Sequence, residues 1–150
     1  MLYLIPLVLG LLALRSPQDP VGDPYFSIME LLILPTAPLM VVSMVAVHAY
    51  ARPEAKASSF TALALMILLA GVTCSVHFTI LSLSRQVDTG LPWMLLILSF
   101  RWPSVPYTLD ILAWDVFFAL AMLFAAPVFK GGRLETAVRT LMRVSGSLSH

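Results

Sequence analysis

Charged side chains are scarce in this sequence: aspartate, glutamate, lysine and arginine together make up only 11% of its 150 residues. A soluble domain typically has about a quarter of its residues charged, because water must wet its surface. Hydrophobic residues make up 59% of the chain, and the mean hydropathy is +0.92. This composition excludes a shell that faces water everywhere. Lipid must cover much of the surface, so the expected partner is a bilayer.

Other absences narrow the possible functions further. A single cysteine, Cys74, excludes an intramolecular disulfide framework. Because Cys74 lies in a long apolar run, we expect a small buried residue rather than a reactive thiol. The net charge of +1 and the lack of a basic cluster indicate no nucleic-acid partner. The sequence contains no HExxH, CxxC, P-loop or GxSxG motif, so no catalytic residue or cofactor is predicted from a motif.

Three apolar segments are long enough to cross a membrane as helices, which requires about 20 residues. They cover residues 25–50, 60–84 and 105–129. Pro35 and Pro38 lie inside the first segment and predict a kink, because each removes a backbone donor and clashes with the preceding turn. A neighbouring helix would have to satisfy the carbonyls that the prolines leave free. The predicted fold is an all-α polytopic bundle forming one transmembrane domain over 1–150.

The roles of the two end segments of the chain are open. Residues 1–14 are apolar but too short for a regular span, and they lack the basic start of a signal peptide. They form either a short fourth span or one whose beginning is missing, so three or four spans are expected. Residues 133–143 place apolar side chains against three arginines. This pattern is typical either of a surface-lying amphipathic helix or of ordinary flanking charge, and we favour the latter.

Residues 91–100 are apolar but cover only half a span. If they do not cross, six basic residues share one side, namely Arg52, Lys56, Lys130, Arg133, Arg139 and Arg143, against three on the other. Cytoplasmic loops carry an excess of lysine and arginine, and a crossing at 91–100 would abolish this asymmetry. We therefore interpret 91–102 as a re-entrant or interfacial segment on the outer side, with loop 51–58 and tail 130–150 cytoplasmic.

Among the ionisable residues inside the predicted spans, Glu30, His77, Asp110 and Asp115 lie deepest, where an ionised side chain costs about 2.5–3.5 kcal/mol. At 1.5 Å per residue, Glu30 and Asp110 lie about 7–8 Å deep and His77 about 10 Å deep, all on the outer side. Asp115 lies about 15 Å deep, near the midplane. We predict that His77 and Asp110 face each other directly or through one water, with Glu30 less close because of the kink. Arg101 could pair with Asp110.

Asp110 and Asp115 are about 140° apart around a regular helix, so both cannot point toward His77. The polar cluster formed by Glu30, His77 and Asp110 has three interpretations. It can fix helix packing, form a binding or proton-coupled site, or hold a metal ion, with catalysis as an extension. No ligand-spacing motif supports the metal. The leading hypothesis is a non-enzymatic, transporter-like or sensory component; the alternatives are a membrane-embedded enzyme or metal-binding protein and a purely structural subunit. A homo-oligomer is left open.

The stretches DPYFSIMELLILPTAPLMVVSMVAVHAYA, GVTCSVHFTILSLSRQ and YTLDILAWDVFFALAMLFAAPVFKG resemble an uncharacterised family of multi-pass bacterial membrane proteins. The resemblance covers residues 23–143, and its most specific element is LDILAWDVFFAL at 109–120. It implies a bacterial inner membrane as the setting. Members of that family have further helices after the segment matching this tail, which implies that the chain is a fragment. No activity is carried over from the family.

Overall fold

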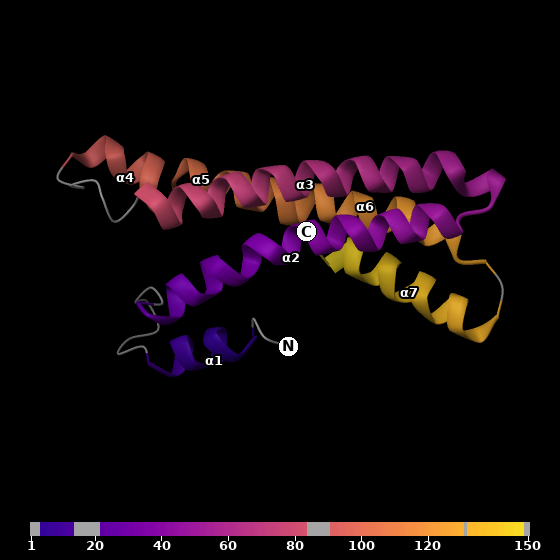
Figure 1. The fold of residues 1–150 in the computed structure, drawn as a ribbon, viewed down its shortest axis with the longest axis horizontal. Coiled ribbons are helices and arrows are strands. Elements are labelled where there is room, and N and C mark those ends of the chain that lie inside the picture. The colour runs from indigo at the N-terminus through magenta and orange to yellow at the C-terminus, as the bar shows by residue number, and fades with distance from the viewer. Residues whose placement is uncertain (1–3, 14–21, 84–90, 131, 149–150) are drawn as a thin grey trace.

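The computed structural model describes residues 4–13, 22–83, 91–130 and 132–148. These ranges contain seven α-helices: α1 (Leu4–Leu12), α2 (Tyr25–Tyr50), α3 (Lys56–Leu83), α4 (Pro92–Leu98), α5 (Val105–Ile111), α6 (Ala119–Ala125) and α7 (Arg133–Leu148). Short 3-10 turns, η1 (Pro53–Ala55) and η3 (Ala126–Val128), adjoin α3 and α6, and a π-helical segment, η2 (Leu112–Phe118), joins α5 to α6. Figure 1 shows α2, α3 and the α5–η2–α6 helix side by side.

Three helical segments among the described residues are long and apolar enough to cross a membrane: Tyr25–Tyr50, Pro53–Leu83 and Val105–Val128. The predicted all-α bundle is therefore confirmed, with three helices of spanning length where three or four spans were expected. The second span begins earlier than expected, because η1 and the first turn of α3 precede residue 60. Many large hydrophobic side chains on these helices are exposed, for example Leu39, Ile67 and Phe78. Apolar surface of this extent is what lipid would cover.

The segment 91–102 does not cross the bundle, as predicted. Figure 1 shows α4 at the end of the bundle where α3 finishes and α5 starts. With seven residues, α4 is too short to span a bilayer. We call this end of the bundle the α4 end. The opposite end, where η1 connects α2 to α3, is the η1 end.

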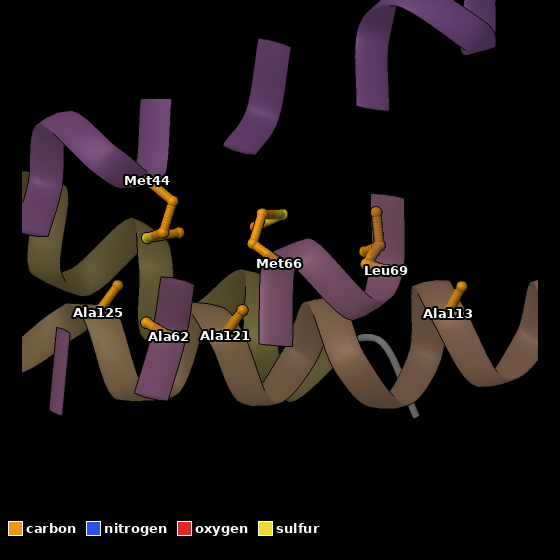
Figure 2. Close-up of a cluster of buried hydrophobic side chains, with 7 residues drawn as sticks. All are labelled: Met44, Ala62, Met66, Leu69, Ala113, Ala121 and Ala125. Carbon is orange, nitrogen blue, oxygen red and sulfur yellow. The ribbon is translucent and has the colours of Figure 1, made fainter. Parts of the chain in front are cut away.

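The centre of the bundle is packed with small and flexible apolar side chains. We call this group the central apolar cluster; Figure 2 shows its members, Met44, Ala62, Met66, Leu69, Ala113, Ala121 and Ala125. Its four alanines come from α3 and from the α5–η2–α6 helix, and all four are fully buried. Small residues let two helix backbones approach closely, which stabilises helix pairs in lipid by van der Waals contact.

Helix α2 changes direction near its middle (Figure 1). Pro35 and Pro38 are the two prolines inside this 26-residue helix. A proline lacks the amide hydrogen that would bond the carbonyl four residues earlier. The predicted bend is therefore observed, and the backbone carbonyls of Leu31 and Leu34 lose their regular partners.

The third span is not one regular helix, contrary to the sequence prediction. Its middle, Leu112–Phe118, is π-helical and lies between the α-helical turns of α5 and α6. A π-helical turn inserts an extra residue and rotates everything beyond it. The 140° separation predicted for Asp110 and Asp115 assumed regular α-helix geometry and does not apply here. Almost every residue of this run is apolar, so its hydrophobic periodicity could not show where the α-helix changes to a π-helix.

Helices α1 and α7 are formed by the two end segments whose roles the sequence leaves open. The described part of 1–14 forms α1, whose nine residues pack against α2. The basic tail forms the 16-residue α7, which packs against α6. Met142 contacts the central apolar cluster. The tail is thus an amphipathic helix held by the bundle, and neither a free surface helix nor merely a charged flank.

Gly146 permits this packing of α7. A Cβ atom built there would lie 2.7 Å from the Ala119 carbonyl oxygen and 2.9 Å from Leu123 Cγ. We expect Gly146→Ala to lower the free energy of unfolding by about 1–3 kcal/mol, because the two backbones must separate. Thermal unfolding in detergent measures this loss. The matched control is Gly71→Ala, since nothing lies within 4 Å of a Cβ atom there; it should be neutral or stabilising. Equal effects of the two changes would contradict the role of Gly146.

Candidate functional site

His77 lies on α3 between two carboxyl groups from two other helices. Its Nδ1 atom is 2.8 Å from Glu30 Oε2, and its Nε2 atom is 3.2 Å from Asp110 Oδ1. Glu30 is 3% exposed and His77 is 5% exposed, whereas the Asp110 side chain keeps 25% of its exposure. We call this arrangement the carboxyl–imidazole triad. It links all three spans at one level near the α4 end.

The predicted contact between His77 and Asp110 is present and direct. The expectation that Glu30 would lie less close is wrong, because Glu30 makes the shorter of the two contacts. Pro35 and Pro38 follow Glu30 in α2, so the bend redirects the whole segment that carries this residue. That segment stays against α3. The burial of His77 and Glu30 also shows that both side chains point into the bundle rather than to lipid.

The two remaining residues predicted for the cluster do not join it. Asp115 is half-buried in η2, and no hydrogen bond or ion pair connects it to any other described residue. Arg101 is exposed and lines a separate cleft with Trp102 and Leu95, so the predicted pair with Asp110 is absent from the described contacts.

Phe100 was not singled out in the sequence, yet its ring packs on the triad. The rings of Phe100 and His77 are 5.5 Å apart between centroids, and Tyr107 packs edge-on to Phe100 at 5.6 Å. Phe100 lies just after α4, in the segment that returns without crossing. Segment 91–102 therefore places an aromatic ring against the imidazole. Its position at the end of a short apolar run was the only available signal.

A cleft of about 730 Å³ opens beside the triad. Its lining is mainly apolar and comes from one face of α2, from His77 of α3, from Phe100 and from the start of the third span. The lining residues are Phe26, Met29, Glu30, Ile33, Thr36, Met40, His77, Phe100, Asp110 and Trp114. Ligand pockets in proteins commonly have about 300–1,000 Å³ and few polar groups on an apolar lining. The cleft meets this description, with the triad as its polar part.

The proton content of the triad follows from its two contacts. A carboxylate only accepts hydrogen bonds, and a neutral imidazole has a single N–H. Each of the two N···O contacts needs one hydrogen. The triad therefore holds two protons, either as an imidazolium between two carboxylates or as a neutral imidazole with one protonated acid. Both forms carry a net charge of −1, which one further proton or one monovalent cation would neutralise.

The geometry does not favour a metal ion at the triad. Nδ1 and Nε2 lie on different edges of the imidazole and each faces one carboxyl group, so the three residues do not direct free donors at a common point. A metal site needs such convergence. Among the described residues, no group of three or more His, Cys, Asp and Glu side chains is arranged to hold a metal.

Cys74 has a structural partner that the sequence analysis did not assign. Its thiol lies 3.7 Å from the Leu34 carbonyl oxygen and donates to it. This carbonyl is the one that Pro38 deprives of its helical donor. Cys74 is half-buried rather than fully buried. The expectation that a neighbouring helix satisfies a freed carbonyl is therefore fulfilled one turn from the triad, because Cys74 is three residues before His77.

This pairing gives a thermodynamic cycle. Cys74→Ala removes the donor and should cost about 1 kcal/mol of unfolding free energy, the usual worth of such a bond. In a Pro38→Ala background the helix supplies its own amide donor, so Cys74→Ala should then cost much less. Chemical unfolding in detergent of all four chains measures the coupling. Equal costs in both backgrounds would show that the thiol does not serve the carbonyl.

A second polar group lies at the η1 end. His48 Nδ1 is 2.9 Å from Ser59 Oγ, and Lys56 donates from Nζ to the His48 carbonyl at 2.7 Å. The central apolar cluster separates this group from the triad along α3, because Ala62, Met66 and Leu69 lie between Ser59 and His77. Thr73, four residues before His77, is fully buried, and its hydroxyl has no hydrogen-bond partner among the described residues.

The fold and the site are those of a multi-spanning α-helical bundle suited to a bilayer, with a buried carboxyl–imidazole triad beside an apolar cleft. Comparison of the chain with models of protein families, with curated protein sequences and with solved structures found no match. The interpretation of function therefore depends on the site itself.

Proposed function

We propose that this chain is a non-enzymatic membrane protein, a sensory or transporter-like component, whose triad binds one proton or monovalent cation reversibly. The observation that supports this function is the pair of contacts that join both nitrogens of His77 to carboxyl groups on different helices. A net charge of −1 in apolar surroundings is costly. Uptake of one positive charge removes that cost and changes the contacts among three spans at once.

The packing favours access from the α4 end. The triad borders the cleft on that side, whereas Met44, Met66 and Leu69 of the central apolar cluster block the way to the η1 end. In this conformation the triad is accessible only from the α4 end, which suits a sensor of the proton or cation concentration on that side. The bend of α2 and the π-helical segment, which flank the cleft, favour a transporter-like cycle as the second candidate, because both can change geometry without breaking a regular helix.

An enzyme is the weaker alternative. A general acid or base must reach the proton that it transfers, and both ring nitrogens of His77 are already bonded to carboxyl groups. A purely structural role predicts that the triad keeps one protonation state over the working pH range. The pH experiment below therefore separates the structural role from the proposed one.

The proposed location is a bacterial inner membrane, with the η1 end in the cytoplasm. The excess of basic residues in 51–58 and 130–150 supports this orientation, and the family resemblance supports the bacterial setting. Single cysteines at Glu54, Leu91 and Gly132, all exposed positions, can be labelled in intact cells in a Cys74→Ser background. We expect only the cysteine at Leu91 to react with an impermeant maleimide. Labelling of the other two positions instead would reverse the orientation.

Trp114 reports on the cleft that it lines. In a chain with Trp93→Phe and Trp102→Phe, it is the only tryptophan. We expect its emission in liposomes to change when the pH on the α4 side falls, because a third proton alters the contact between His77 and Asp110 one turn away. Acidification of the η1 side alone should leave the emission unchanged at first.

The control for this experiment is the same chain with Glu30, His77 and Asp110 all replaced by leucine. It should fold, because no charge remains unpaired, and its emission should not depend on pH. An emission independent of pH in the parent chain, or an equal response in the control, would overturn the proposed function.

A further inference from the structure

The cleft is elongated along α2. Phe26, Met29, Ile33, Thr36 and Met40 line it from this helix, at successive spacings of three, four, three and four residues, so they occupy one face. The ten-residue step from Glu30 to Met40 covers about 15 Å of helix axis, a length that accommodates a chain of about a dozen methylene groups. The cleft is therefore a groove with an acidic end and an apolar remainder.

The acidic end has the chemistry that recognises an ammonium group. The triad carries a net charge of −1, and Asp110 keeps a quarter of its side-chain exposure, so its carboxyl group is accessible to a ligand. The aromatic rings of Phe26, Phe100 and Trp114 line the same groove. A cation near an aromatic face is attracted by the ring quadrupole, in addition to its pairing with a carboxylate. Carboxylate and rings together favour a cation over an anion or a neutral head group.

We propose that the groove binds a single-chain amphiphile with an amine or quaternary ammonium head, its chain along α2 and its head at Asp110 and Phe100. This inference rests on the proposed function, because the amphiphile supplies the monovalent cation that neutralises the triad. It specifies the ligand class that the function leaves open. Binding of the amine and binding of a third proton exclude each other, so a low pH on the α4 side weakens amine binding.

The charged groups around the triad are consistent with this competition. Glu30 approaches His77 from α2, and Asp110 approaches it from α5. Tyr107 of α5 contacts Phe100 rather than the imidazole. Arg101 lines the separate cleft, and Asp115 has no bonding partner among the described residues. Within the described part of the chain, no lysine or arginine forms an ion pair with either carboxyl group of the triad.

The test uses dodecylamine with a nitroxide near the end of its chain, added to the protein in phosphatidylcholine nanodiscs that hold one copy each. Trp114 is again the only tryptophan, and the nitroxide quenches it at short range. We expect saturable quenching by the amine and none by the matching dodecanoic acid or dodecanol. Asp110→Asn should weaken the amine at least tenfold, and a fall in pH should weaken it in the parent chain.

A matched pair of variants tests the path of the chain. Thr36→Phe fills the groove at an exposed position of its lining, whereas Leu39→Phe adds the same ring to an exposed position outside it. Only Thr36→Phe should abolish saturable quenching. Because both positions are exposed, neither change disturbs the core.

Equal quenching by amine, acid and alcohol would mean that bilayer chains fill the groove, and it would overturn the inference. Loss of quenching in nanodiscs that hold two copies would assign the groove to a second copy and would likewise overturn it. If the amine fails while the emission of Trp114 still responds to pH, the ligand class is wrong and the proton-binding function stands. If both responses fail, the function and the inference fall together.

Discussion

A chain carrying His77→Leu is expected to be less stable in detergent than one in which Glu30, His77 and Asp110 are all leucine. In the single variant two carboxyl groups remain at one level without the imidazole between them. Removing one partner of a buried charged pair costs about 3–5 kcal/mol, because the survivor stays uncompensated. In the triple variant apolar side chains replace all three groups, and such a replacement is often neutral. Thermal or chemical unfolding of the parent chain, the His77→Leu and Glu30→Leu variants and the triple leucine variant measures the difference.

The exposures predict an order among the single variants. Asp110→Leu leaves Nε2 of His77 without its carboxyl partner but removes a side chain that is 25% exposed. Glu30→Leu removes the shorter and more buried contact, so it should cost more than Asp110→Leu. Asp115→Leu is the control, since Asp115 lies in the same span and makes no bond to any described residue. Losses that simply add from single to triple variant would contradict the coupling of the triad.

Ala121→Leu is expected to have the second large effect. Ala121 is fully buried in the central apolar cluster, as are Ala62 and Met66 from α3. A leucine adds three heavy atoms where two helix backbones are in close contact. Such overpacking costs about 1–3 kcal/mol or more, because the surroundings must shift or adopt poor rotamers. The free energy of unfolding in detergent or bicelles should fall accordingly.

Ala46→Leu is the matched control for this change. Ala46 is exposed on α2, where an added leucine would meet lipid, so it should leave stability nearly unchanged. A loss at Ala46 as large as that at Ala121 would show that the cluster is no more tightly packed than the lipid-facing surface. A Met66→Leu variant, which nearly conserves volume, should cost less than Ala121→Leu.

The arrangement of the spans could be predicted because it depends on length, hydropathy and charge. The scarcity of charge in residues 60–84 is sufficient to predict a span. The short length of 91–100 left its role open, and the asymmetry of basic residues predicted that it does not cross. Depth could also be predicted, since 1.5 Å per residue places His77 and Asp110 at a common level. The two side chains are in contact at 3.2 Å, as we predicted from their matched depths. Pro35 and Pro38 predicted the bend in the same local way.

The remaining features depend on contacts that a single sequence does not encode locally. The direction of the bend decides whether Glu30 reaches His77, and proline alone does not set a direction. The π-helical segment 112–118 depends on how α5 and α6 pack against α3. The pairing of Cys74 with the Leu34 carbonyl needs the relative rotation of two helices. Phe100 joins the site only because a short segment returns to the same end of the bundle.

The depth of the triad has an electrical consequence. His77 is six residues from Leu83, the last residue of α3, so it lies about 9 Å from the helix end, roughly 0.3 of a hydrocarbon core about 30 Å thick. A proton that reaches His77 from the α4 end therefore crosses about 0.3 of the membrane voltage. At about 2.3 kcal/mol per charge per 100 mV, this fraction corresponds to about 0.7 kcal/mol. In an energised cell with a negative interior, and with the α4 end outside, the proton-binding constant of the triad would rise about threefold for each 100 mV. The site would then respond to both components of the proton-motive force.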